Sequence, residues 1–547
     1  MNTLSPRSNL DHLRKQAKDL LRAYRRAEPE AFQRIRQSLP AARGMEDSAL
    51  ASLQLRLHDM QSCVAREHGL ASWQDLKDAV DTMRAKARDL AALRLHWFRL
   101  VYGGDIAGGP GRPRPERAAR VLEEHPEIAG DDPHVACAIG DMASIERTLE
   151  KDSTWIDRSS GPLNIPPLIA ITHSSLARMA SHREPLRRAL KLLLDRGASP
   201  NQSVGNRWPP NSLEKPGDER LTAIYGAAGK LHDEHMTAML LSAGADANDN
   251  ESLYHSIDDP RRELPCTRLL LEAGTRVPGT NALAKVLDFD NLQGLKMLLA
   301  HTPHAHPDLN HALFWSIYRG RSAAHVQALL DAGADPRSLD AHPRSVHHHA
   351  DMFGLPEALK LLKDGEPSAP MSVQERFVAA CARGDETAAR ALLQENPGII
   401  ATLSPSQLKL LPNMAMSGRD ETVRLMVKMG WPIATRGGDI DGSALNWAVF
   451  RGDASLARFL LEHGASFREP HGYGSDVLGT LSWASINVPR VGGDWPGCAA
   501  ALLEYGMPAA TTSLEHDAVG EMRVVLIDGR RATFPEEVAD VLLDAAD

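Results

Sequence analysis

The chain has 547 residues, 43% hydrophobic and 24% charged, an ordinary range for folded proteins that excludes wholesale disorder. Only 5% of the residues are aromatic, so the core must be built from Leu, Ala and Val, which favours helices over a β-sandwich or barrel. The net charge of −9 is uneven: residues 1–99 hold 18 Lys and Arg against 12 Asp and Glu, whereas the rest of the chain holds 44 against 59.

Cysteine spacing and hydropathy limit the cellular compartments in which we expect this protein. The five cysteines lie far apart without a CxxC pair, which excludes a disulfide scaffold and a Cys-rich zinc site and fits a reducing compartment. Residues Met1–Arg14 lack the apolar segment of a secretory signal, and no run of about 18 apolar residues occurs in the chain. We therefore expect a cytoplasmic protein without a membrane span.

Residues 1–100 are predicted to form a helical, basic N-terminal region. Apolar residues recur at helical spacing from Leu10 to Tyr24, and further helices are expected over 31–39, 52–68 and 73–83. One face of the first helix carries Arg14, Lys15, Lys18, Arg22, Arg25 and Arg26. A solvated face is the simplest interpretation, and docking onto an acidic partner or onto the chain's own acidic repeats stays open.

Residues 101–132 are predicted to contain a Gly/Pro-rich loop and a first degenerate helix. The segment Gly103–Pro115 (GGDIAGGPGRPRP) is too rich in Gly and Pro for a regular element. We therefore expect a flexible loop there.

Residues 133–510 contain an internal repeat with a period of about 30–34 residues, lengthened in places by loops. Clear copies read LKLLLDRGASPN at 190–201, MLLSAGADAN at 239–248 and FLLEHGASF at 459–467. A glycine after each apolar helix suits the left-handed conformation just beyond a helix end. The glycines that define the repeats are Gly197, Gly244, Gly274, Gly333, Gly430 and Gly464.

Each repeat also contains a shorter first helix. In the copy that begins at Gly442, Ser443 can cap this helix by accepting backbone N–H bonds. The unit is therefore helix, tight turn, helix, glycine stop and loop. One unit alone cannot bury its apolar face, so the roughly eleven copies must stack as a solenoid.

The last segment, 511–547, is predicted to be a divergent cap. Residues Met522–Ile527 are β-prone, and Asp528-Gly529 is a strong hairpin signal. Thr533 with Glu536 has the pattern of a capping box that opens a final helix. A β-hairpin and helix of this kind would cover the exposed end of the stack.

The spacing and the Gly-Ala-Asp/Ser endings resemble the ankyrin repeat. The Thr-Pro-Leu-His-x-Ala box of that family is eroded here, with SALNWA at 443–448 in its place. The N-terminal region resembles the small helical region that often precedes ankyrin arrays in bacterial proteins, through AREHG at 65–69 and Ser72-Trp73. The resemblance implies a bacterial source and an all-α, ankyrin-like helix-turn-helix repeat solenoid.

No motif for catalysis, phosphate binding or zinc binding occurs in its required context, so we expect no catalytic residue, no metal and no cofactor. The most metal-like cluster is His347, His348 and His349 with His342. Consecutive helical residues point about 100° apart, so three in a row cannot face one ion. An enzyme whose residues meet only in the folded chain remains an alternative.

Aromatic residues in the long loops are the candidates for partner contacts. Arg207 and Trp208 lie in the insert 201–219, and Tyr473 and Trp495 lie in the insert 471–495. Trp, Tyr and Arg dominate the energetics of protein interfaces. The alternative is that these side chains fold back and fill gaps between repeats.

The sequence therefore predicts a non-enzymatic scaffold that presents a concave repeat surface to a partner protein. The acidic repeats favour a basic partner, or the basic N-terminal region bound in cis. A nucleic-acid partner is disfavoured, because Asp11 and Asp19 interrupt the basic face. A secreted effector or a toxin-neutralising ankyrin protein is a further alternative.

Overall fold

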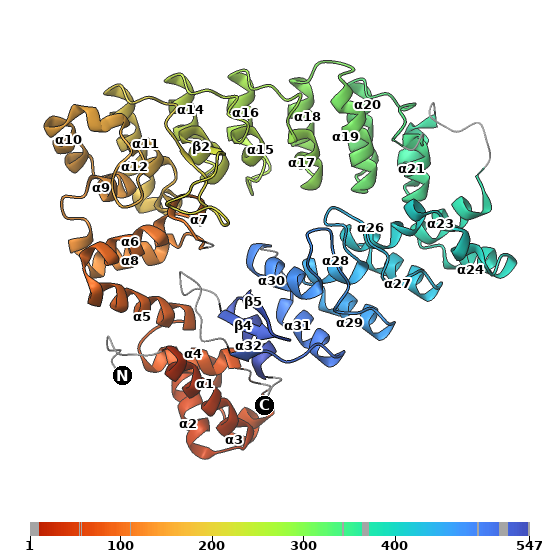
Figure 1. Cartoon of the computed structure of the whole chain (residues 1–547), viewed down its shortest axis with the longest axis horizontal. Coiled ribbons are helices and arrows are strands. Elements are labelled where there is room, and N and C mark those ends of the chain that lie inside the picture. Colours follow the sequence, from red (N-terminus) through yellow and green to blue (C-terminus); the bar gives the residue numbers. More distant parts are fainter. Residues whose placement is uncertain are drawn as a thin grey trace. The chain divides into compact units, whose positions relative to one another are not determined.

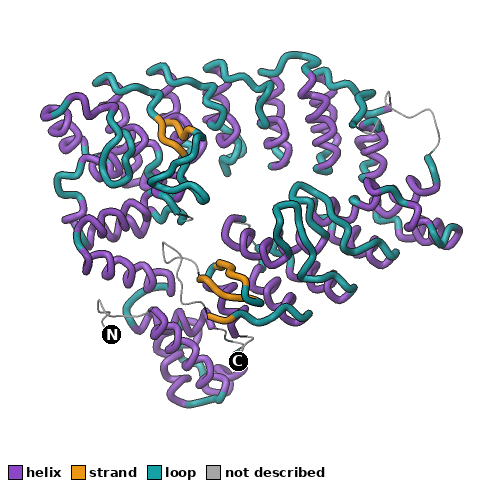
Figure 2. Tube along the Cα trace, viewed as in Figure 1, coloured by secondary structure: helices purple, strands orange, loops and turns teal. Residues whose placement is uncertain are grey.

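The computed structural model describes residues 10–53, 55, 57–109, 111–341, 344–363, 371–488, 492–512 and 523–544. They fall into two compact units, the first ending at Ser252 and the second beginning at Leu253. Helices dominate both units, and the described strands form two small sheets (Figure 2). No helix among the described residues combines the length and apolar character needed to cross a membrane.

The first unit opens with a helical module of α1 (Leu10–Arg25), α2 (Pro29–Ser38), α3 (Asp47–Ser52), α4 (Leu57–Glu67) and α5 (Trp73–Arg88) (Figure 1). The single helix expected over 52–68 is wrong, because α3 ends at Ser52 and α4 begins at Leu57. The Tyr24 hydroxyl donates to the carbonyl of Leu50 at 2.9 Å, which occupies the end of α3. A buried tyrosine from another helix therefore binds a carbonyl in the last turn of α3.

Three helices join the module to the repeats: α6 (Leu90–Val101), α7 (Gly104–Ala107) and α8 (Pro115–Glu124). The expectation of a flexible loop over Gly103–Pro115 is wrong for its first part. The amide of Gly104 donates to the carbonyl of Gly111 at 2.9 Å, and Ile106 is fully buried. Arg207 of a distant insert donates to the Ile106 carbonyl at 2.7 Å, so tertiary contacts hold a turn that local composition disfavours.

The remainder of the first unit consists of α9 (Pro133–Ile139), α10 (Met142–Lys151), α11 (Pro167–Thr172), α12 (Ala180–Asp195), β1 (Ser203–Gly205), β2 (Arg220–Thr222), α13 (Ala223–Tyr225) and α14 (Glu234–Ser242). The antiparallel pair β1/β2 forms the base of the 201–219 insert, with Val204 opposite Leu221. A π-helix over Gly226–Lys230 continues α13.

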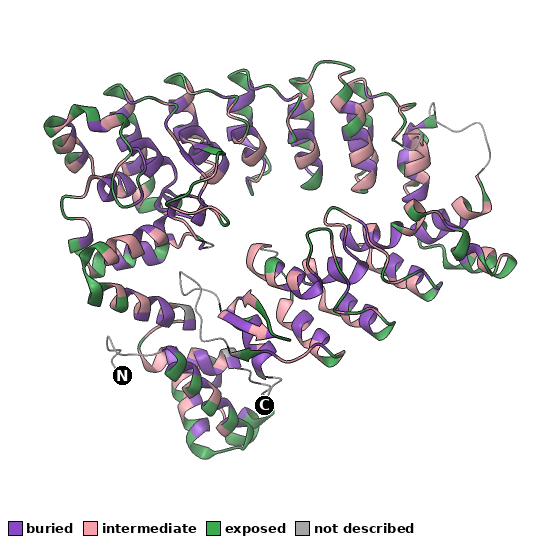
Figure 3. Ribbon diagram, in the orientation of Figure 1, coloured by how far each residue is buried: buried purple, intermediate pink, exposed green. Residues whose placement is uncertain are grey.

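The repeat helices of the second unit are α15 (Ser252–Ser256), α16 (Pro265–Glu272), α17 (Ala282–Asp288), α18 (Leu292–Ala300), α19 (Pro307–Tyr318), α20 (Ala323–Asp331), α21 (Val346–Met352), α22 (Pro356–Leu361), α23 (Val373–Arg383), α24 (Glu386–Glu395), α25 (Pro405–Leu408), α26 (Leu410–Met416), α27 (Asp420–Lys428), α28 (Ala444–Phe450), α29 (Ala454–Glu462), α30 (Val477–Asn487) and α31 (Trp495–Glu504). First helices contact first helices (α17, α19 and α21, then α26, α28 and α30), and second helices contact second helices in the same way. Figure 3 shows buried residues along the stacked helices and exposed residues at their outer turns. The predicted all-α, ankyrin-like solenoid is confirmed.

The glycines at the ends of the second helices share one backbone conformation. The φ angles lie between +91° and +97° for Gly197, Gly244, Gly274, Gly333, Gly430 and Gly464. At the start of α28 the Ser443 hydroxyl accepts the backbone N–H of Asn446 at 3.3 Å. The glycines therefore mark the ends of the second helices, and Ser443 marks the beginning of a first helix.

The C-terminal cap contains β3 (Thr511–Thr512), β4 (Arg523–Ile527), β5 (Arg530–Phe534) and α32 (Glu536–Asp544). The hairpin predicted at Asp528-Gly529 is confirmed by the pairing of Ile527 with Arg530, while Met522 lies outside the described residues. The capping role of Thr533 is wrong, because Thr533 pairs with Val524 inside the sheet. The cap contacts the last repeat through α32 and α31.

Candidate functional site

Two repeats of the second unit end their first helix with an aromatic residue, an arginine and a glycine. These are Tyr318-Arg319-Gly320 at the end of α19 and Phe450-Arg451-Gly452 at the end of α28. In both, the arginine is the C-cap residue, and the glycine that follows has a positive φ, +63° at Gly320 and +67° at Gly452. Both arginines therefore leave their helix at the same point of the repeat.

Arg319 links an adjacent repeat to one that is distant in sequence. Its Nε donates to Asp288 Oδ1 at 2.7 Å, and its Nη2 donates to Asp439 Oδ2 at 2.5 Å. The guanidinium also lies over the Trp315 ring, 4.4 Å from the ring centre. Burial by itself lowers the pKa of Arg319, but its hydrogen bond to Asp439 and the charge of Asp288 outweigh burial and raise that pKa. The cation is thus held in place by two carboxylates and an aromatic face.

A groove of about 490 Å³ surrounds this ion pair. It is lined by Asp288, Arg319, Arg321, Met416, Ser417, Gly418, Asp439, Trp447, Phe450 and Arg451. Trp447 is nearly fully buried, and its Nε1 donates to the Gly437 carbonyl at 2.9 Å. Arg451 donates to Asp420 Oδ1 at 2.7 Å. These bonds fix the wall of the groove without a ligand.

Aromatic rings continue from the groove onto α30. Phe450 meets Trp447 edge to face at 5.4 Å and stacks on Trp483 at 5.6 Å with an interplanar angle of 16°. Trp483 is 55% exposed, although exposure of a large apolar ring to water is unfavourable. This stack is the kind of aromatic surface that forms the centre of protein interfaces. The sequence pattern did not single out this stack, and the shared aromatic-Arg-Gly motif is the signal that points to one of its members, Phe450.

Arg207, expected as a partner contact, is buried and only 2% exposed. Its Nη1 donates to the carbonyl of Ile106 at 2.7 Å and its Nη2 to that of Asn164 at 3.1 Å. Trp208 beside it is half-buried, with its ring against Gly104. The expectation that Arg207 contacts a partner is therefore wrong, because the side chain is buried. It fills a gap within the first unit, as the alternative interpretation expected.

Tyr473 and Trp495 lie in different surroundings. Tyr473 is 78% exposed at a loop tip, where the neighbouring Gly472 amide donates to the Ile440 carbonyl of the preceding repeat at 2.8 Å. Trp495 is half-buried at the first residue of α31, and its Nε1 is buried without a hydrogen-bond partner among the described residues. Neither residue lines the groove.

The histidine cluster does not form a metal site in the described structure. His349 Nε2 lies 2.9 Å from Asp340 Oδ2, whereas His348 Nδ1 lies 3.5 Å from Glu375. The described residues contain no group of three His, Cys, Asp or Glu arranged to hold an ion. His342 lies outside the described residues.

A serine, a histidine and an aspartate meet near α9. Ser160 Oγ lies 3.2 Å from His134 Nε2, but Asp132 Oδ1 is 3.7 Å from His134 Nδ1. That oxygen accepts the backbone N–H groups of His134 at 2.9 Å and Val135 at 3.4 Å. Asp132 therefore caps α9, and at 3.7 Å it does not orient the imidazole as a catalytic triad requires.

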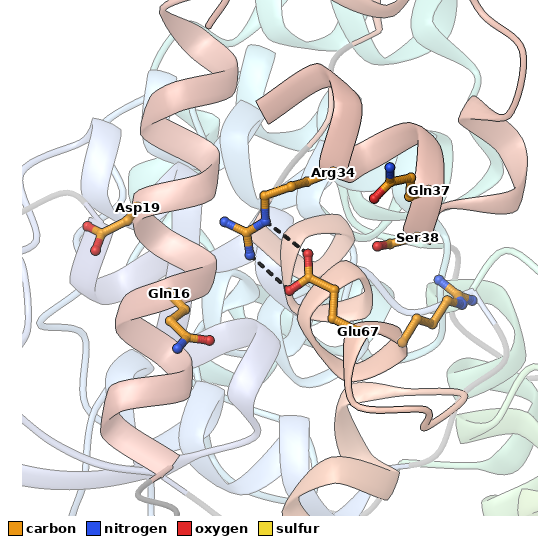
Figure 4. Close-up of a pocket in the computed structure, with 7 residues that line it drawn as sticks. Gln16, Asp19, Arg34, Gln37, Ser38 and Glu67 are labelled. Atoms are coloured by element: carbon orange, nitrogen blue, oxygen red, sulfur yellow. Dashed lines mark hydrogen bonds and ion pairs between the residues drawn. The ribbon is translucent and has the colours of Figure 1, made fainter. Parts of the chain in front are cut away.

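The N-terminal module has a polar pocket between α1, α2 and α4 (Figure 4). Arg34 Nε and Nη2 both donate to the Glu67 carboxylate at 2.9 Å, and Gln16 and Asp19 line the pocket from α1. The bidentate hydrogen bond with Glu67 raises the pKa of Arg34. Arg34 is therefore paired within the chain, and Arg66 also lines this pocket.

The fold and the groove define a helix-pair repeat protein whose second unit carries a groove lined by aromatic and charged side chains. No protein family and no curated protein matches the chain. Among solved structures, the human ASB11 ankyrin repeat domain is 21% identical and the ankyrin repeat domain of Bcl-3, a member of the IkappaB family, is 19% identical. The alignments cover 43% and 48% of this chain, 100% and 98% of those chains, and have a TM-score of 0.21 in both cases.

Proposed function

We propose that the chain is a non-enzymatic scaffold that binds a partner protein through the inner-helix groove of its second unit. The stack of Trp447, Phe450 and the half-exposed Trp483 is the observation that carries this proposal. Burying such rings against a partner releases water from a large apolar area. Tyr473 at its loop tip is a second contact in this proposal.

Rigidity supports the same function. Trp447 is tied to Gly437, and Arg451 to both the Ala415 carbonyl and Asp420. Side chains that are fixed before binding lose little entropy when a partner arrives, so more of the contact energy becomes affinity.

The partner is proposed to be a basic protein segment, since the chain beyond residue 99 carries 44 Lys and Arg against 59 Asp and Glu. The basic N-terminal region is the competing occupant in cis. We place the protein in the cytoplasm of a bacterium: the resemblance of its N-terminal region supports the bacterial source, and five free, buried cysteines support a reducing compartment.

Affinity capture from the native host tests the proposal, with the wild-type chain, Trp483→Ala and Tyr473→Ala as matched baits. We expect a stoichiometric partner that is released by Trp483→Ala. If only Tyr473→Ala releases the partner, the binding surface lies at the loop tips and not in the groove. A partner that survives both substitutions contradicts a role for either surface.

A further inference from the structure

The more exposed charged groups of the groove are carboxylates, and its guanidiniums lie deeper. The side chains of Asp288 and Asp439 are 38% and 40% exposed, whereas those of Arg319, Arg321 and Arg451 are 14%, 18% and 14% exposed. A partner that approaches this surface meets negative charge first. Carboxylates exposed beside aromatic rings favour a cationic side chain.

Each of the two carboxylates retains an unused oxygen. Asp288 Oδ1 accepts from Trp315 Nε1 at 2.9 Å and from Arg319 Nε at 2.7 Å, while Asp439 uses Oδ2 for Arg319. Asp288 Oδ2 and Asp439 Oδ1 accept no hydrogen bond from any described residue. An ionised carboxylate has about four acceptor positions, so both groups can bind a second cation.

The recessed arginines do not offer the groove to an anion. Arg321 pairs with Asp290 at 3.1 Å, and Arg451 pairs with Asp420 at 2.7 Å. An acidic partner would have to displace these carboxylates and pass the charges of Asp288 and Asp439. Repulsion therefore disfavours an acidic segment here.

From these observations we propose that the groove recognises an arginine side chain within a basic segment of the partner protein, an inference that rests on the proposed function. The guanidinium would donate to Asp288 Oδ2 and Asp439 Oδ1 and stack on the aromatic surface of Phe450 and Trp483.

The chain satisfies its own arginines by the same combination of contacts. Arg319 lies 4.4 Å from the centre of the Trp315 ring while it binds two carboxylates. Arg424 lies 4.7 Å from the centre of the Phe459 ring and 3.7 Å from the Glu421 carboxylate. Arginine fits better than lysine, because its planar fork can donate in two directions and stack at once.

Titration calorimetry on the full chain tests the inference with a short capped peptide of arginines spaced by glycine and serine. The same peptide with citrulline keeps the shape and removes the charge. We expect the arginine peptide to bind at least about tenfold more tightly, the effect of one charge-assisted hydrogen bond. Equal binding of the two peptides overturns the inference.

Asp439→Asn and Asp288→Asn should each lower the affinity for the arginine peptide by about tenfold. Glu462→Gln is the matched control, since it removes an exposed carboxylate from the outer helix α29 and should leave binding unchanged. Because the asparagine variants also disturb Arg319, Trp483→Ala provides a variant that touches none of the ion pairs. Binding that is insensitive to all three groove substitutions overturns the inference.

The two proposals fail in different ways. If the arginine and citrulline peptides bind equally but Trp483→Ala releases the natural partner, the arginine site is overturned and the scaffold function stands. A natural partner retained by Trp483→Ala overturns the groove as the interface, whatever the peptides do.

Discussion

Gly333 and Gly464 occupy the same place in two repeats but differ in the space around them. Their φ angles are +97° and +95°. A Cβ at Gly464 would meet nothing within 4 Å, whereas a Cβ at Gly333 would lie 2.7 Å from the backbone nitrogen of Ala305. That nitrogen donates to the Ala332 carbonyl at 3.1 Å, a bond between neighbouring repeats. Alanine at the two positions therefore separates backbone strain from steric conflict.

Gly464→Ala should cost about 1–2 kcal/mol, the penalty of the left-handed region for a residue with a Cβ. Gly333→Ala should cost about 0.5–1.5 kcal/mol more, because the displaced Ala305 amide loses its hydrogen bond to the Ala332 carbonyl. Hydrogen exchange measures this locally, which suits a repeat array whose unfolding need not be two-state. We expect faster exchange of the Ala305 amide in Gly333→Ala only. Equal destabilisation by both alanines, with unchanged exchange at Ala305, would refute the reasoning.

Three further predictions concern single side chains. Arg207→Ala should destabilise α7 by about 1–3 kcal/mol, because it removes the hydrogen bond to the carbonyl of the buried Ile106, and amide exchange in α7 should become faster. Arg220→Ala, at an exposed position, should leave that exchange unchanged. Arg319→Met should lower the free energy of unfolding, measured in urea at low salt, by about 1–3 kcal/mol. Adding Asp439→Asn to this variant should recover part of the lost stability. If the two substitutions instead lower the stability additively, the ion-pair account is contradicted. Burial lowers the pKa of His173 from 6.5 to about 3, so the unfolded state binds its proton first and stability should fall as the pH drops from 6.5 towards 3. His173→Gln should flatten this pH dependence in urea titrations, and an unchanged slope would contradict it.

The fold was accessible from the sequence because its determinants are local. A glycine after each apolar helix and a capping residue such as Ser443 act within a few residues of the chain. The hairpin at Asp528-Gly529 is also set by neighbouring residues. Where a distant side chain intervenes, as Tyr24 does at the end of α3, the local pattern gave the wrong boundary.

The candidate site was harder to predict from the sequence than the fold. Arg207 and Trp208 have the composition of an interface, but burial depends on which insert packs against which turn. The sequence pattern did not single out Phe450 and Trp483, because only the packing of α28 on α30 brings the two rings together.

The sequence alone determined the repeat unit, because helix length, glycine stop and turn are decided by residues in direct succession. The tertiary structure alone decided the groove. Arg319 lies 31 residues from Asp288, in the neighbouring repeat, but 120 residues from Asp439, and one guanidinium brings the two carboxylates together. The period of a repeat does not encode such a contact, because it specifies each unit's neighbours and not the meeting of units that are many repeats apart.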